Sequence, residues 1–406
     1  MSYNLRYIYF APADIQVPRV DRQGVVHFCE ALYRIGVDVE LVTLGITLLD
    51  HEVKAAHPLD LYRIREKFPV RTVPTSIHQS NQDQPLRSAL TRLWVDGTEA
   101  VRYVRLQPRE RPLLFFMKNY GPALVCLMFR ALSRKKVMVM FEAHTVPKRW
   151  LQRMILRRLD GTIANCIALG RDLVNDHGVP AERVLGIHQG IDLELIDQDR
   201  ISREEARLRL GLPAQKKLVV YAGKIYFGYR EVEYLLETAR LMKERGDVEF
   251  ILVGGRADHV DNYRGKIAEM GLDNVRFTGF VPVTDVQQFL SAADALVMYY
   301  PTGLELNKYR SPGKLFEYMA SGRPIVAADF PVLHEVLGEH PPAVFTEPDN
   351  PPALAAALER VLAGGEEMEE MAARALERVR NYSWIVRAHS IMGYIRGRAA
   401  ARGFSV

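Results

Sequence analysis

The chain has 406 residues, of which 48% are hydrophobic and 25% charged, and its formal net charge is +5. This length predicts about two to three domains, and the composition is typical of a globular protein. The small charge without interleaved aromatics argues against nucleic acid as a partner. The longest apolar run, residues 120–129, is about half of what a membrane-spanning helix needs, which excludes such a helix.

The beginning of the chain, MSYNLRYIYFAP, predicts a first strand. It lacks the basic start, long apolar core and small-residue cleavage site of a secretion signal. The three cysteines, Cys29, Cys126 and Cys166, are far apart, and each lies in or beside an apolar stretch. They predict buried thiols and a cytoplasmic protein.

The first half of the chain alternates short apolar runs with amphipathic segments, which predicts a parallel sheet covered by helices. We expect one helix at 25–35 and strands at 5–10, 37–44, 112–117, 136–141, 161–164 and 183–187.

A charged stretch, ISREEARLRLGLP, follows Asp197 and predicts a linker. A second α/β series comes after it, with strands at 217–222, 249–253, 275–277, 295–299 and 324–327 and helices at 231–245, 283–292 and 315–321. The predicted domains are therefore residues 1–197 and 198–383. The remaining residues, 384–406, predict a helix that either caps the second domain or crosses back onto the first, and we assign it to the first.

Five motifs in this order resemble the retaining glycosyltransferases of family 4, and the resemblance covers nearly the whole chain. They lie at 141–144 (FEAH), 160–194, 221–241, 274–282 and 311–331 (SPGKLFEYMASGRPIVAADFP). The resemblance implies the GT-B fold, in which two Rossmann-like doubly wound domains face each other across a cleft. It places the nucleotide-sugar donor mainly on the second domain and the acceptor mainly on the first.

The segment around Gly313 precedes a helix, and free backbone amides at a helix N-terminus attract phosphate. Lys314 adds a cation there. The other interpretation is an ordinary loop with Ser311 as the helix cap and Pro312 in the first turn. The resemblance favours phosphate binding and includes Ser311, Gly313, Lys314 and Leu315 in the donor site.

Glu317 lies on an otherwise apolar helix face, where a carboxylate is costly unless it is paired. The resemblance implies that it accepts hydrogen bonds from both ribose hydroxyls, whereas the alternative is a salt bridge to a neighbouring cation. The family usually has another glutamate eight residues earlier, but here Tyr309 stands there. Tyr309, Glu305 or only the backbone amides of residues 311–313 remain as candidates to contact the sugar.

Lys224 and Arg230 flank a loop in which Gly223 and Gly228 allow sharp turns. Without the resemblance, we would interpret them as solvated cations. The resemblance places both on the donor diphosphate, where they would offset the charge on the leaving nucleotide. It also includes Gly223 and Phe280 in the donor site.

His144 follows an apolar strand, at the end where open α/β sheets bind ligands. The resemblance implies that it contacts the donor sugar near the reacting carbon. Glu142 would share a face with His144 if the strand continued that far, but a bend would part them. Gly24 is expected just before the first helix, where it would face the donor phosphate.

Neither a metal nor a cofactor is expected, because no DxD-type pair lies on a strand end and the sequence has no HExxH and no His/Cys cluster with ligand spacing. Lys224, Arg230 and Lys314 would take the place of a divalent ion. Nine basic residues against one acid between Arg130 and Arg158 suggest either solvated helix faces or docking on an anionic membrane surface. Docking would place the protein peripherally on the inner face of the membrane.

The predicted function is metal-independent hexosyl transfer to a glycan or lipid-linked saccharide with retention of configuration. The resemblance implies front-face attack, in which the leaving phosphate accepts the proton of the acceptor. Two alternatives are a nucleotide-sugar epimerase of the same fold and an inactive nucleotide-sugar-binding protein. A dinucleotide-dependent oxidoreductase is disfavoured, because no GxGxxG follows the first strand.

Overall fold

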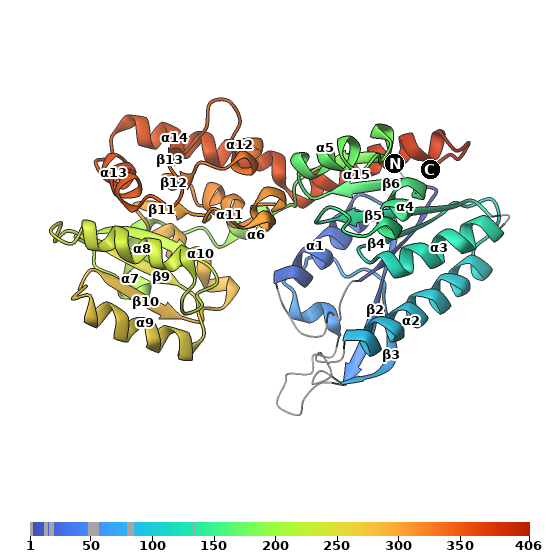
Figure 1. Ribbon diagram of the computed structural model, residues 1–406, viewed down its shortest axis with the longest axis horizontal. Coiled ribbons are helices and arrows are strands. Elements are labelled where there is room, and N and C mark those ends of the chain that lie inside the picture. The colour runs from blue at the N-terminus through green and yellow to red at the C-terminus, as the bar shows by residue number, and fades with distance from the viewer. Residues whose placement is uncertain (1–2, 12–14, 16–19, 48–56, 79–84, 134) are drawn as a thin grey trace. The chain divides into compact units, whose positions relative to one another are not determined.

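The structure, a computed structural model, describes residues 3–11, 15, 20–47, 57–78, 85–133 and 135–406. The chain forms two compact units (Figure 1). Unit 1 is Met1–Gly190 with Trp384–Val406, and unit 2 is Ile191–Ser383. The boundary after Gly190 precedes the one predicted from the sequence, which follows Asp197.

Unit 1 contains a parallel sheet with the strand order β3-β2-β1-β4-β5-β6-β7 in the described residues. Its central strands are buried at every position and apolar except for Glu142, as expected for strands covered on both faces. The strands are β1 (Arg6–Phe10), β2 (Asp38–Thr47), β3 (Val70–His78), β4 (Leu113–Met117), β5 (Val137–Ala143), β6 (Gly161–Ala164) and β7 (Val184–Gly186).

Two groups of helices cover this sheet. On one face, Tyr7 and Tyr9 of β1 share a core with α1 and α15. On the other, Phe141 of β5 packs on Tyr120 of α3, with ring centroids 4.6 Å apart, and α2 and α4 flank α3. The helices are α1 (Val20–Arg34), α2 (Pro85–Leu106), α3 (Tyr120–Leu132), α4 (Trp150–Arg158), α5 (Ile167–Asn175) and α15 (Trp384–Ala400), with short 3-10 turns at η1 (Pro58–Leu61) and η3 (Ala181–Arg183).

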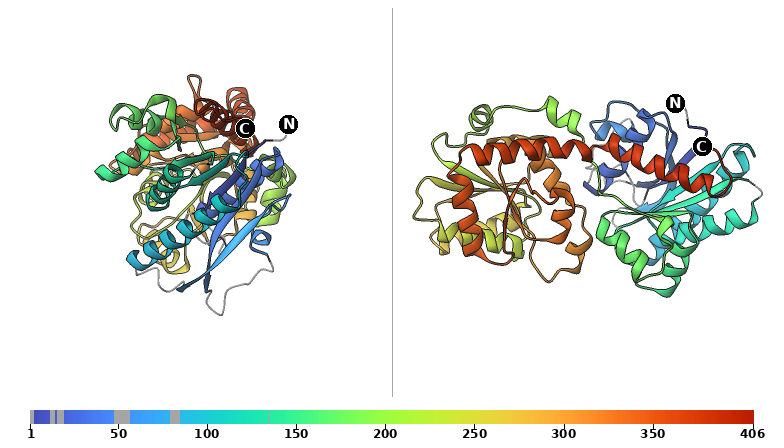
Figure 2. Two further views of the ribbon diagram at one scale, coloured as in Figure 1. Left: turned by 90° about the vertical axis from the view of Figure 1, so that its right-hand side faces the viewer. Right: turned by 90° about the horizontal axis from the view of Figure 1, so that it is seen from above.

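The last helix, α15, is part of unit 1. It packs against α1 (Figure 2). Its Arg396 lies 4.4 Å from the ring centroid of Tyr3 near the start of the chain. Its fully buried residues in the unit 1 core include Ile391, Met392 and Ile395.

Unit 2 contains a second parallel sheet, with the order β10-β9-β8-β11-β12-β13. In both sheets the strand order reverses beside the first strand, which confirms the prediction of two Rossmann-like doubly wound domains. The strands are β8 (Lys217–Ala222), β9 (Val248–Val253), β10 (Val275–Gly279), β11 (Ala295–Met298), β12 (Ile325–Ala328) and β13 (Val344–Thr346).

The helices of unit 2 include several that the sequence reasoning did not predict, notably α9, α13 and α14. They are α6 (Leu193–Gln198), α7 (Arg203–Leu210), α8 (Arg230–Leu241), α9 (Ala257–Glu269), α10 (Val283–Ala292), α11 (Gly313–Ser321), α12 (Pro331–Leu337), α13 (Pro351–Leu362) and α14 (Glu366–Arg378), with 3-10 turns at η4 (Glu305–Tyr309) and η5 (Val379–Tyr382).

The predicted linker after Asp197 is wrong for most of its length, because α7 is a packed element of unit 2. Arg207 is buried and donates to Asp294 Oδ2 over 2.6 Å and to the carbonyl of Ala292 over 3.0 Å. Charged residues are common in linkers, but here the buried ion pair anchors the helix to the sheet.

Candidate functional site

The predicted site residues of both units lie mainly at the carboxyl ends of the strands, where a doubly wound sheet leaves room for ligands. In unit 2, β8 leads into the loop 223–229, and α11 begins at Gly313 shortly after the end of β11. Gly254 has a φ of +119°, and a Cβ there would overlap the carbonyl oxygen of Gly223. Glycine is therefore required where the ends of β8 and β9 approach each other.

Lys314 is held by a polar network beneath that loop. Its Nζ donates to the hydroxyl of Tyr221 over 3.0 Å, and Tyr221 donates to Glu231 Oε2 over 2.6 Å. Burial lowers the pKa of Lys314, and the cation of Arg310 adds to this, whereas Glu231 opposes it. A Cβ at Gly223 would collide with Nζ of Lys314, so glycine keeps this position open for the lysine.

Glu317 lies one turn after Lys314 on α11 and is half-buried. Among the described residues, its carboxylate has no hydrogen bond and no ion pair within 4.0 Å. Burial raises the pKa of Glu317 from 4.5 to about 7, only partly opposed by the charge of Lys314. The salt bridge considered as the alternative role for Glu317 is therefore not formed in this structure.

Lys224 and Arg230 lie at opposite ends of the loop 223–229. Lys224 is exposed and without an ion-pair partner in the described chain, and its charge contributes to the lowered pKa of Lys314. Arg230 begins α8 and lies 3.2 Å from Asp349 Oδ2. Asp349 also accepts from the backbone N–H of Thr302 over 3.1 Å, so Arg230 is anchored to two other loops.

The start of α11 differs from the capping arrangement considered for the sequence. Pro312 occupies the N-cap position and no side chain caps the helix, so Ser311 is not the cap. The N–H groups of Gly313 and Leu315 bond to the carbonyls of Ser311 and Pro312, at 3.0 and 2.9 Å. The amide of Lys314 has no acceptor among the described residues, and this amide is the one open to an anion.

The other predicted donor residues take different environments. Phe280 follows β10 and is 82% exposed, and Leu315 is buried in the core below α11. Of the candidates for the sugar, Tyr309 is buried in η4, whereas Glu305 is exposed.

In unit 1, His144 directly follows β5, and Glu142 lies on the same side of the strand end. His144 Nε2 is 3.3 Å from Glu142 Oε1, close enough for an ion pair when the ring is protonated but not aligned as a hydrogen bond. His144 Nδ1 is 3.2 Å from Asn165 Nδ2. The strand ends at Ala143 and the chain bends at His144, but the bend does not part the two side chains.

Glu142 is the centre of a buried charge cluster. Its carboxylate lies 3.4 Å from Lys118 Nζ, which follows β4, and 3.4 Å from a guanidinium nitrogen of Arg387 on α15. Tyr9 donates to it over 3.3 Å. Burial alone would raise the pKa of Glu142, but Lys118, His144 and Arg387 together hold that pKa well below its ordinary value.

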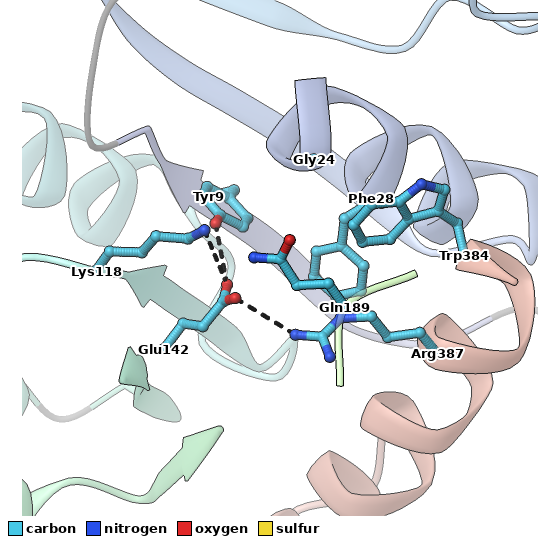
Figure 3. A pocket seen from close by; sticks show the side chains of 8 residues that line it. All are labelled: Tyr9, Gly24, Phe28, Lys118, Glu142, Gln189, Trp384 and Arg387. Atoms are coloured by element: carbon cyan, nitrogen blue, oxygen red, sulfur yellow. Dashed lines mark hydrogen bonds and ion pairs between the residues drawn. The ribbon is translucent and has the colours of Figure 1, made fainter. Parts of the chain in front are cut away.

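This cluster forms one wall of a pocket within unit 1 (Figure 3). Arg387 is fixed by the carbonyls of Ile187 and His188, so its side chain cannot turn away from Glu142. Phe28 and Trp384 supply an aromatic wall opposite Lys118 and Glu142. The complete lining is Tyr9, Gly24, Phe28, Lys118, Glu142, Gln189, Trp384 and Arg387.

Gly24 lines this pocket, but the prediction that it precedes the first helix is wrong. Helix α1 begins at Val20, so Gly24 lies one turn inside it and offers no free helix N-terminus. A Cβ at this position would make an ordinary van der Waals contact with the Trp384 ring, 3.4 Å away.

The structure thus groups the predicted residues by unit. Gly223, Lys224, Lys314 and Glu317 gather at the strand ends of unit 2, whereas His144 and Gly24 lie in unit 1. Sequence reasoning missed Lys118 and Arg387. A cation directly after the apolar strand LLFFM was a usable signal for Lys118, but nothing distinguishes Arg387 from the other arginines of its helix.

Two further predictions concern the whole chain. All three cysteines are buried free thiols, as expected. Among the described helices, none has both the length and the apolar character needed to traverse a bilayer.

Family models match both units. Residues 23–195 match the model described as Glycosyltransferase Family 4, and residues 216–364 match Glycosyl transferases group 1.

Curated relatives carry transferase names. The chain is 28% identical over 267 residues to a D-inositol 3-phosphate glycosyltransferase of Nocardioides sp., with 62% of this chain and 57% of the relative covered. It is 27% identical over 241 residues to the alpha-D-kanosaminyltransferase of Streptomyces kanamyceticus, with 58% and 60% covered. The matched part of this chain therefore spans less than two thirds of the length of these relatives.

Solved structures share the fold across nearly the whole chain. Sucrose-phosphate synthase from Thermosynechococcus elongatus superposes with a TM-score of 0.70 at 20% identity, covering 98% of this chain and 100% of that one. Anabaena Alr3699/HepE in complex with UDP gives a TM-score of 0.68 at 17% identity, covering 96% and 99%.

Proposed function

The chain belongs to the glycosyltransferases of family 4, and from this premise we propose that it transfers a hexose from a nucleotide-diphosphate donor with retention of configuration. The donor nucleotide lies on unit 2. The new bond joins the acceptor oxygen to the anomeric carbon, and the bond from that carbon to the phosphate oxygen breaks. The acceptor hydroxyl gives its proton to the leaving phosphate.

The observation that carries this proposal is the unpaired carboxylate of Glu317. A half-buried carboxylate without a protein partner is costly, and a ligand that donates hydrogen bonds to it removes the cost. The two ribose hydroxyls of a nucleotide are donors of this kind. Glu317 therefore selects the ribose end of the donor.

Cations beside Glu317 suit the diphosphate. Lys314 and Lys224 lie at the strand ends, and the free amide of Lys314 adds a donor at the start of α11. Arg230 is held nearby by Asp349. Fixed positive charge of this kind stabilises the leaving nucleotide without a divalent ion.

We place the acceptor on unit 1 and propose a glycan or a lipid-linked saccharide. His144 is positioned by Glu142 at the end of β5, where it would meet the sugar near the reacting carbon. The basic segment of unit 1 supports peripheral attachment to an anionic membrane on its cytoplasmic face.

Donor binding is the first test. Thermal shift and calorimetry with UDP-, GDP-, ADP- and dTDP-sugars should identify one donor that raises the melting temperature. UDP-glucose comes first, because one of the structural neighbours was solved with it. The proposal fails if none of these donors binds.

Transfer is the second test. The acceptor panel should include D-inositol 3-phosphate, after the name of the curated relatives, and a lipid-linked saccharide. Analysis of the products with and without acceptor separates the alternatives. Conversion of the donor sugar without any acceptor would identify an epimerase, and binding without turnover on any acceptor would identify a binding protein.

A further inference from the structure

An apolar, cationic surface covers part of unit 1. Nine of the eighteen large apolar side chains exposed in the described chain lie on just three helices, α2, α3 and α4. These helices pack side by side (Figure 1). Arg130 of α3 donates to the carbonyl of Arg158 of α4 over 3.0 Å. Exposed apolar side chains so concentrated mark an interaction surface.

The outer face of α3 is unusual because it carries no charge. Its exposed residues are all small or apolar: Gly121, Leu124, Met128, Ala131 and Leu132. Met128 and Leu132 are 58% and 81% exposed. A helix that faces only water normally places polar residues on this side.

The neighbouring helix α4 adds a tryptophan and cations. Trp150 is 70% exposed, and Leu151 and Met154 are also exposed. Lys148, Arg149 and Arg153 beside them have no acidic partner within 4.0 Å in the described chain. Of the nine basic residues predicted for this segment, Arg134 lies outside the described residues.

Acidic groups are lacking on this surface. Between residues 120 and 158 the single acid is Glu142, which is buried in the charge cluster. A second copy of the chain would bring cations opposite cations, which disfavours self-association through this face. A partner with an anionic surface and an apolar interior matches both the cations and the exposed apolar side chains of this surface.

We propose that the surface formed by α3 and the start of α4, called the α3–α4 surface, docks the protein on an anionic membrane. Leu124, Met128, Leu132, Trp150, Leu151 and Met154 enter the boundary between head groups and acyl chains, and Lys148, Arg149 and Arg153 contact lipid phosphates. Tryptophan and long cationic side chains suit this boundary, because each has an apolar body and a polar end. This inference deepens the proposed function, because it places the acceptor at the membrane. Only the statement about the acceptor rests on the proposed function, whereas the docking itself does not.

The experiment measures flotation of the full chain with vesicles of phosphatidylcholine containing about one third phosphatidylglycerol. The test variant is Met128→Ser/Leu132→Ser/Trp150→Ser. The control is Leu208→Ser/Leu241→Ser, which removes exposed leucines from unit 2, where Leu208 is 83% exposed. We expect the test variant to lose about tenfold or more in vesicle binding, while the control binds as the wild type does.

The contribution of charge is tested separately. Arg153→Glu should weaken binding to anionic vesicles, and Lys243→Glu, an exposed cation on unit 2, should not. Wild-type binding should fall with added salt and should be weaker on pure phosphatidylcholine. Equal binding to both vesicle types would overturn the anionic specificity.

Other outcomes overturn the proposal as a whole. They are no flotation of the wild type at low salt, undiminished flotation of the triple variant, or concentration-dependent dimerisation that the triple variant abolishes. Titration of the same variants with the UDP-, GDP-, ADP- and dTDP-sugars keeps the two proposals distinguishable. Vesicle binding without donor binding would refute only the proposed function, and donor binding without vesicle binding would refute only docking.

Discussion

Replacement of Glu317 by glutamine should stabilise the unliganded protein and weaken donor binding. Most substitutions in a folded domain destabilise it, so this combination is distinctive. It follows from a half-buried carboxylate that lacks a partner until the donor arrives.

The stability effect depends on pH in a defined direction. The pKa of Glu317 is about 7 in the folded protein and 4.5 when the group is free in water. The folded state therefore holds the proton more tightly, which favours folding below pH 4.5, and this advantage is lost as the pH rises through 7. The difference between the two pKa values corresponds to about 3 kcal/mol of unfolding free energy. Because Glu317 is partly exposed, solvent screening reduces this contribution to about 1–2 kcal/mol.

The assay combines denaturant unfolding at pH 5 and pH 8 with calorimetric titration of the donor. Glu317→Gln should gain about 1–2 kcal/mol in unfolding free energy at pH 8 and much less at pH 5. Its donor affinity should fall by about 1–3 kcal/mol, because a neutral amide accepts weaker hydrogen bonds than a carboxylate. Glu244→Gln, an exposed site on unit 2, is the matched control and should change neither quantity.

Loss of stability at pH 8 together with unchanged donor affinity would refute this reasoning and assign Glu317 a structural role. Donor affinity of the wild type should also rise with pH between about 6 and 8, because the ionised carboxylate is the better acceptor. Glu317→Gln should lose this pH dependence. A nucleotide sugar is the proper ligand here, because its diphosphate diester does not itself titrate in this range.

Three further changes test other parts of the molecule. Lys314→Met should weaken donor binding by about 2 kcal/mol in calorimetry, whereas Lys243→Met should leave it unchanged; equal affinities would remove Lys314 from the diphosphate site. Glu142→Gln should lower the unfolding free energy by about 3 kcal/mol, because the buried Arg387 and the partly buried Lys118 lose their counter-charge; an unchanged denaturation midpoint would show that water already compensates them. Gly254→Ala should cost about 2 kcal/mol or more in the same denaturation assay, since its φ of +119° and its contact with Gly223 both exclude a Cβ, and a neutral result would mean that the loop readily moves.

Much of the local structure could be predicted from short stretches of sequence. The run VMVMFEA of β5 is buried at every position, and a strand covered on both faces is predominantly apolar, as this one is except for Glu142. The helix α11 could be located from the residues around Gly313, although its cap could not. The predicted start of α1 at Val25 is too late, because the helix begins at Val20. The polar residues before Val25 interrupt the apolar periodicity, although they are compatible with a first helical turn.

The partners of the charged groups could not be predicted in this way. The cations around Glu142 come from the segment after β4 and from α15, and Arg387 is separated from it by 245 positions, so no local pattern predicts this cluster. Arg230 pairs with Asp349 across 119 positions. A carboxylate beside a strand end has the same local sequence signal whether it meets a cation, a ligand or water.

The sequence by itself determined the two α/β series and the residue types placed at the strand ends, because backbone periodicity and helix termini are local properties. Only the tertiary structure decided which charges are neutralised and which are left without a partner. Glu142 is surrounded by cations from distant segments, whereas Glu317 has none within ion-pair distance in the described chain. Desolvation and Coulomb energies depend on distances through space, and the fold alone sets those distances.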